Sequence, residues 1–341
     1  MKKTLIALAA LAATGTAFAQ SSVTISGKFG VSGVKNEIGN KKAETNFGVT
    51  DGDVKFSGVE DIGGGLKADF GMEIRVRGRV GTKTDDNGGN GYGIGARNST
   101  IGLSHTSFGK ITTGAIEVAN GIKARGWAGA PIGIANSLEG KNVNGNGTGG
   151  PLGSAYNSDI LQYTSPELVK GLTVTAFRLD NISSPAASTT RGSTANALGV
   201  SYTDGPISAG ADYTIFNKNT MTNLTKEATR IRVSGSYDFG VAVIGAGYED
   251  FSDMRVAVNN KANYTAGVKV PLGAFTVGGV FAKSDAKKAD ASAFATKAYG
   301  LAAQYDFSKR TNVNYTFLKQ SDSAVATYEG NRHQLRLMHS F

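Results

Sequence analysis

Side chains that could carry covalent or metal chemistry are scarce in this sequence. The chain has no Cys and only three His, which are His105, His333 and His339. The absence of Cys excludes disulfides, Cys-ligated zinc and a thiol nucleophile, and three widely spaced His form no local metal-ligand motif. None of the three has an obvious nucleophile as its partner. We therefore expect no enzyme, no metal and no cofactor.

Charged side chains offer a different chemistry. The chain carries 36 Lys and Arg against 27 Asp and Glu, for a formal net charge of +9. The basic residues are dispersed along the whole chain, which argues against a nucleic-acid partner. Five of them stand at polar positions of segments in which polar and apolar residues alternate: Lys28, Lys55, Arg75, Arg77 and Arg336. Cations that line a water-filled passage would favour the entry of anions.

These five residues lie in segments that read as β-strands. Apolar and polar residues alternate with a period of two over 66–77, 230–237, 264–270 and 299–307. This period gives a strand one apolar face and one polar face. After residue 19, no stretch approaches the roughly 18 apolar residues that a membrane-spanning helix needs.

Connections of two kinds alternate along the chain. Seven are short and carry turn residues, at 61–64, 107–110, 167–171, 204–206, 238–240, 271–273 and 307–310. Eight are longer and rich in Gly, Asn, Ser, Thr and Lys, at 35–46, 78–95, 119–156, 181–194, 217–228, 252–262, 284–296 and 320–330. Fifteen connections predict sixteen strands of about ten residues, the length that a tilted transmembrane strand needs.

The pattern predicts an all-β protein, a 16-stranded antiparallel transmembrane β-barrel with short periplasmic turns and long extracellular loops. Backbone polar groups cannot stay unpaired in lipid, so the sheet must close. Apolar rows then face lipid, and polar rows face a lumen that is wide enough to hold water. Closure makes the last strand a neighbour of the first, so the five cations form one basic wall. Two roles stay open for this wall: ion selectivity, or pairing with Asp53, Asp69 and Glu73.

The first 19 residues have a different character. Lys2 and Lys3 precede an apolar run over 5–13, and Ala17, Phe18 and Ala19 form a small-x-small cleavage site. This order is typical of a secretory signal peptide. We therefore predict a cleaved signal peptide at 1–19 and a barrel at 20–341.

Several segments resemble the general porins of Gram-negative outer membranes, in their β-proteobacterial branch. The resemblance rests on GVEDIGGGLKA (58–68), IGLS (101–104) with FGK (108–110), NSDILQYTSP (157–166), YDFGV (237–241), YDFSKRT (305–311) and the terminal Phe341. Each segment alone is a weak signal, but their ordered occurrence covers the whole chain after the signal peptide.

The resemblance implies a homotrimer in the bacterial outer membrane, in contact with lipid and lipopolysaccharide. Ions and small hydrophilic solutes would diffuse passively through each barrel. Phe341 would serve as the insertion signal that the barrel-assembly machinery reads. Relatives commonly carry Arg where this chain has Asp53, Ser57 and Ala115, so we expect only moderate anion selectivity.

The resemblance also implies that the third long loop, 119–156, folds inward and narrows the pore. An outer loop without regular structure is the alternative for this segment. An inward loop would bring Glu117, Lys123, Arg125 and Asp159 to the constriction, with Glu117 and Asp159 as the acids that face the basic wall. We place Arg230 and Arg332 near the outer mouth, where they would steer solutes or bind lipopolysaccharide phosphates.

Three other functions remain as alternatives. A substrate-specific channel would need a track of aromatic residues along the lumen. An outer-membrane barrel hydrolase would need a Ser–His or Asp–His constellation at one height. A surface adhesin would carry its function wholly in the loops.

Overall fold

A computed structural model describes residues 22–38, 44–77, 93–118, 156–183, 193–217, 227–252, 260–287, 294–322 and 329–341. These ranges form sixteen strands: β1 (Ser22–Ile38), β2 (Glu44–Gly63), β3 (Leu66–Arg77), β4 (Gly93–His105), β5 (Gly109–Val118), β6 (Tyr156–Thr164), β7 (Leu172–Ser183), β8 (Ser193–Asp204), β9 (Ile207–Phe216), β10 (Ala228–Asp238), β11 (Val243–Ser252), β12 (Asn260–Leu272), β13 (Phe275–Lys287), β14 (Phe294–Asp306), β15 (Thr311–Asp322) and β16 (Gly330–Ser340). The predicted signal peptide, 1–19, lies outside the described residues.

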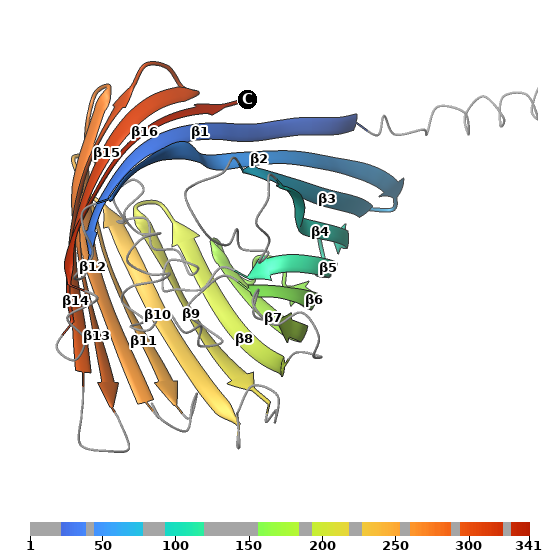
Figure 1. Cartoon of the computed structure of the whole chain (residues 1–341). Helices are drawn as coiled ribbons and strands as arrows, with labels where there is room; N and C mark the ends of the chain where they lie inside the picture. The colour runs from blue at the N-terminus through green and yellow to red at the C-terminus, as the bar shows by residue number, and fades with distance from the viewer. Residues whose placement is uncertain are drawn as a thin grey trace, which may run out of the picture.

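The strands form one closed antiparallel barrel (Figure 1). Each strand pairs with its sequence neighbours, and β1 closes the barrel by pairing with β16. The predicted 16-stranded barrel is therefore confirmed. The described residues contain no helix that is long and apolar enough to cross a membrane.

All seven predicted turns connect neighbouring strands at one end of the barrel. The turn between β2 and β3 shows how the sequence builds them. The backbone N–H of Gly63 donates to Asp61 Oδ1 over 2.9 Å, and Gly64 and Gly65 adopt φ of +62° and +82°. Because L side chains rarely adopt positive φ, this turn favours glycine.

Side chains alternate between an outward row and an inward row on every strand. The outward rows hold large exposed apolar residues such as Ile25, Leu161 and Leu301, the last of which is 60% exposed. The inward rows hold buried polar and charged residues, including Ser32, Asp53 and Asn314. This arrangement matches the predicted lipid-facing and lumen-facing rows.

Two inward surfaces are apolar, which the sequence interpretation did not predict. Ile160, Leu179, Ala195, Phe216 and Ala228 form one buried cluster on β6–β10. Val280, Ala282, Ala298, Ala302 and Leu318 form a second on β13–β15. Their burial means that these parts of the inner wall do not line open water. The simple rule that inward residues are polar therefore fails in these two regions.

The end of the chain completes the seam between β1 and β16. Phe341 and Gly27 exchange two backbone hydrogen bonds of 2.9 Å each. The register puts Phe341 in the same row as the exposed Leu335 and Leu337. A Cβ at Gly27 would lie 2.6 Å from Phe341 Cζ, so the missing side chain makes room for the terminal ring.

Candidate functional site

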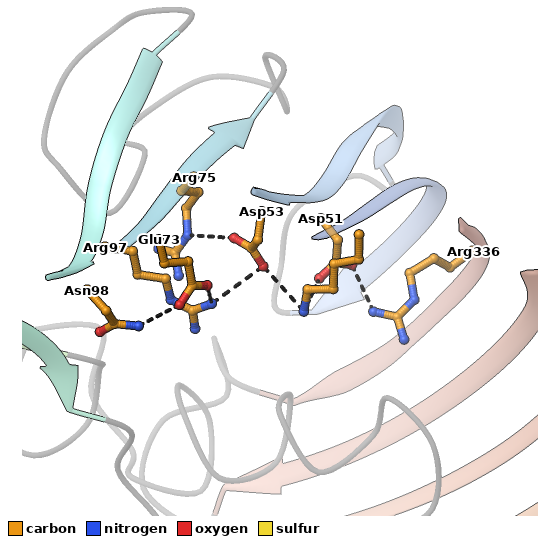
Figure 2. A network of polar contacts seen from close by, with 8 residues as sticks. Asp51, Asp53, Glu73, Arg75, Arg97, Asn98 and Arg336 are labelled. Carbon is orange, nitrogen blue, oxygen red and sulfur yellow. Dashed lines mark hydrogen bonds and ion pairs between the residues drawn. The ribbon is translucent and has the colours of Figure 1, made fainter. Parts of the chain in front are cut away.

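A continuous network of charged side chains crosses the inner wall from β16 to β4 (Figure 2). Arg336 donates from Nη1 to Asp51 Oδ2 over 3.0 Å. Lys28 lies between two carboxylates, with Nζ 3.5 Å from Asp51 Oδ1 and 3.4 Å from Asp53 Oδ2. Asp53 also faces Arg75, whose Nε lies 3.7 Å from Asp53 Oδ1. Opposite charges thus alternate along the network.

Arg97 closes the network on β4. Its Nη1 donates to Glu73 Oε1 over 2.7 Å and to Asp53 Oδ2 over 3.4 Å. Asn98 Nδ2 donates to the other oxygen of Glu73, Oε2, over 2.6 Å. Glu73 is therefore held from two consecutive residues of one strand.

Two β-bulges lie in the strands that carry this network. Between Gly30 and Val31 of β1, the partner strand β2 contains one extra residue, Thr50. Between Glu73 and Ile74 of β3, the partner strand β4 contains one extra residue, Arg97. A bulge breaks strict alternation and re-aims side chains. The bulge at Arg97 lets both Arg97 and Asn98 reach Glu73 on the inner wall.

We use the name charged wall for Lys28, Asp51, Asp53, Lys55, Glu73, Arg75, Arg97 and Arg336. Lys55 joins it by register, because it pairs with Ser26 and Glu73. Five cations and three carboxylates give the wall a charge of +2. Lys28 is 40% exposed, Arg97 28%, and Arg75 and Arg336 13% each. Solutes inside the barrel can therefore reach part of its positive charge.

The sequence interpretation named four of these cations and missed Arg97 and Asp51. Arg97 shares its sequence parity with Ser99, Ile101 and Leu103, and the two apolar residues of these three are exposed on the outward row. Strict alternation would therefore point Arg97 into lipid, where an Arg is costly. An Arg at such a position is itself the signal that could have indicated a bulge.

The remaining predicted site residues do not join the charged wall. Lys123 and Arg125 lie outside the described residues, and so does the side chain of Arg77. Asp159 is exposed and pairs with Ala115 and Asp180 on the outward rows, next to the exposed Leu161. Our placement of Asp159 at the constriction was therefore wrong. The side chain of Glu117 lies outside the described residues.

A second charged group lies on β9–β11. This buried cluster consists of Asp212, Arg230, Arg232 and Glu249. Arg232 Nε donates to Asp212 Oδ2 over 2.8 Å, and Arg230 Nη2 lies 3.7 Å from Asp212 Oδ1. Glu249 pairs directly with Arg232 across the strands. The side chains of Asp212, Arg230 and Arg232 are at most 4% exposed, so Arg230 is not the accessible mouth residue that we expected.

Two further contacts hold Arg230 in place. Its Nη2 donates to Thr214 Oγ1 over 3.2 Å. Its guanidinium carbon lies 5.6 Å from the centre of the Phe216 ring, which is within cation–π range. Among the described residues, no group of three or more His, Asp or Glu is placed to hold a metal ion.

Comparisons with known proteins agree with this architecture. Residues 4–324 match the family model described as Gram-negative porin. Outer membrane porin protein 32 of Delftia acidovorans is 29% identical over 345 residues, which cover 95% of this chain and 92% of the relative. An outer membrane porin protein of Bordetella pertussis is 26% identical over 402 residues, which cover 98% of this chain and 100% of the relative.

Solved structures show the same fold. The structure described as an anion-selective porin from Comamonas acidovorans aligns with a TM-score of 0.66 and 22% identity, over 94% of this chain and all of that chain. OmpT of Vibrio cholerae in its trimer form aligns with a TM-score of 0.64 and 12% identity, over 94% and 99%.

Proposed function

Because this chain belongs to the Gram-negative porin family, and is an outer-membrane diffusion channel, we propose that the charged wall gives it a moderate preference for anions. One observation carries the proposal: five cations and three carboxylates share one partly exposed inner surface, with Arg97 at its β4 edge. The positive excess raises the local concentration of anions. The paired carboxylates offset most of the cationic charge, so the preference is moderate.

The test is the zero-current potential of the purified protein in planar bilayers across a KCl gradient. Wild type should show an anion preference. Arg97→Gln should shift the potential toward cations, and Asp53→Asn should shift it toward anions. Opposite shifts from two residues in contact would support an electrostatic effect of the wall, whereas a change in pore width would not follow the sign of the charge.

Lys170→Gln is the matched control. Lys170 pairs with Asp204 at the short-turn end of the barrel, 2.6 Å apart, and its side chain is 81% exposed. The substitution removes the same charge far from the wall, so the potential should stay at the wild-type value. A cation-selective wild type in dilute KCl would contradict the proposal.

We also propose that the protein assembles as a homotrimer, since OmpT of Vibrio cholerae, which shares its fold, has a trimer form. Unheated samples should migrate in SDS gels at three times the chain mass, and boiled samples at the chain mass. A single monomer mass by light scattering in mild detergent would contradict this assembly.

A substrate-specific channel has less support. Among the inward side chains that the structure describes, the aromatic ones are Phe177 and Phe216, and Phe216 is 2% exposed. Two neighbouring rings, one of them buried, do not form a track along a lumen.

A further inference from the structure

Lys55 differs from the other cations of the charged wall in its contacts. Each of the other four lies within 3.7 Å of a carboxylate oxygen: Lys28, Arg75, Arg97 and Arg336. Lys55 forms no ion pair with any carboxylate that the structure describes. It is exposed, and its register places it on the inner wall. Lys55 is therefore the described cation of the wall that is both unpaired and accessible.

The carboxylate closest to Lys55 in the strand register is held by other residues. Glu73 stands directly opposite Lys55 on β3, and opposite charges in this position stabilise a sheet. Glu73 instead accepts one hydrogen bond on each oxygen, from Arg97 Nη1 over 2.7 Å and from Asn98 Nδ2 over 2.6 Å (Figure 2). Both donors lie at the bulge of β4. The bulge thus keeps Glu73 away from Lys55 and leaves the ammonium free.

The chemistry of the free group determines which anions the wall can distinguish. A guanidinium presents a planar fork that matches two oxygens of a carboxylate or phosphate, whereas an ammonium is a compact point charge with rotatable donors. The three guanidinium groups of the wall face its own carboxylates, and their side chains are 13–28% exposed. An anion from solution therefore meets an ammonium, which responds to charge and hardly to shape.

From these contacts we infer that Lys55 is the residue of the wall that contacts passing anions, and that it does not distinguish chloride from a carboxylate. The inference rests on the anion preference proposed above and names the class of solute, which is small anions in general and not one oxyanion. Arg97 and Asn98 are then positioning residues, because they hold Glu73 away from the lysine.

The first test exchanges the ammonium for a guanidinium without a change of charge. Lys55→Arg places a free guanidinium in the lumen, where a carboxylate gains a bidentate contact that chloride cannot make. The acetate-to-chloride permeability ratio, from reversal potentials under bi-ionic conditions in planar bilayers, should rise roughly two- to fivefold, the range that an exposed ion pair contributes.

Lys28→Arg is the matched control for this variant. Lys28 lies between Asp51 and Asp53, so a guanidinium at this position would face the same carboxylates and the acetate-to-chloride ratio should stay at the wild-type value. An unchanged ratio in Lys55→Arg, or an equal rise in both variants, would overturn the inference.

Both arginine variants keep the wall at +2, which separates this inference from the proposed anion preference. Their reversal potentials in a KCl gradient should equal that of wild type, which also shows that the barrel is intact. A cation-selective wild type would contradict the anion preference. An anion-selective wild type in which Lys55→Arg has no effect would contradict only the role of Lys55.

A second test measures whether the amine of Lys55 is free. The purified protein in detergent is treated with limiting acetic anhydride, and peptide mass spectrometry follows each lysine relative to its rate in the unfolded protein. Lys55 should react roughly two- to fivefold faster than Lys28, because Lys28 must leave two carboxylates before its nitrogen can attack.

The same measurement tests the role of the bulge. Arg97→Gln/Asn98→Ala lacks both donors to Glu73, so the carboxylate can turn to Lys55 and the rate at Lys55 should fall toward that of Lys28. Equal rates at the two lysines in wild type, or an unchanged rate at Lys55 in the double variant, would overturn the inference.

Discussion

The charged wall on β16–β4 and the buried cluster on β9–β11 use the same residue types in opposite ways. In both, Arg side chains contact Asp at 2.8–3.7 Å. The wall, however, keeps Lys28 40% exposed and Arg97 28% exposed, whereas Asp212 and its two Arg partners are at most 4% exposed. Ion pairs of the same type are therefore accessible to water and ions in the charged wall and inaccessible in the buried cluster.

This difference separates permeation from stability. An exposed charge acts on passing ions, but its pairing contributes little to folding because water screens it. A buried charge has lost its hydration, so removing its partner leaves an uncompensated ion in a medium of low dielectric constant. We therefore expect the wall to control selectivity and the buried cluster to control stability.

The largest expected effect is on the stability of the buried cluster. Asp212→Ala removes the carboxylate that both Arg230 and Arg232 contact. Breaking a buried pair in this way costs about 3–5 kcal/mol. We expect a loss of that order in the free energy of unfolding, measured by denaturant titration in detergent.

Asp204→Ala provides the matched control for that variant. Asp204 pairs with the exposed Lys170, and pairs of this kind contribute about 1 kcal/mol or less. Equal losses for Asp212→Ala and Asp204→Ala would remove the distinction between the two regions.

The second effect concerns ion permeation through the wall. Arg75→Gln/Arg97→Gln removes two of the five cations and turns the wall from +2 to neutral. A unit charge about 10 Å from an ion in water changes its energy by ~0.4 kcal/mol, or roughly twofold in occupancy. Removing two such charges should lower anion occupancy roughly fourfold and raise cation occupancy by the same factor, so the anion-to-cation permeability ratio should fall by roughly 16-fold in dilute KCl, as reversal potentials measure.

Lys170→Gln/Lys309→Gln is the control for the double variant, because both lysines are exposed at the short-turn end. It removes the same two charges and should leave the permeability ratio unchanged. If it lowers the ratio as much as Arg75→Gln/Arg97→Gln does, overall charge and not the wall determines selectivity.

The sequence predicted the barrel well and the wall only in part. Alternation and the two classes of connection predicted sixteen strands, because lipid and closure impose both patterns. Lys28, Lys55, Arg75 and Arg336 followed from strict alternation. Asp51 has the parity of Asp53 and Lys55, so alternation would have included it as well. Arg97 did not follow from alternation, because a bulge places it on the inner wall, and the sequence period does not show a single extra residue.

The same reasoning explains the other errors. Asp159 was assigned to the lumen because it borders the third long connection, yet its strand parity places it beside Leu161 on the outward face. Burial of Arg230 and of Phe216 arises from tertiary packing of the inner wall. The local sequence does not predict that packing.

A smaller effect distinguishes charge from geometry at the bulge. Arg97→Lys keeps the positive charge but loses the planar guanidinium, which reaches Glu73 and Asp53 together. Selectivity should stay within about twofold of wild type, while Arg97→Gln shifts it clearly. A lysine variant as defective as the glutamine variant would show that the shape of the wall, and not its charge, determines permeation.

The smallest expected effect is the different response of the charged wall and the buried cluster to salt. The Debye length falls from ~10 Å at 0.1 M to ~3 Å at 1 M, so at high salt the wall charges no longer reach ions near the pore axis. The anion preference should therefore fade between about 0.1 and 1 M KCl. Buried pairs are screened much less, so the stability lost in Asp212→Ala should stay nearly constant over the same range. Reversal potentials and unfolding titrations at matched salt concentrations measure both. A preference that persists at about 1 M would require a selectivity element other than the charged wall, and a salt-dependent loss in Asp212→Ala would mean that ions reach the buried cluster.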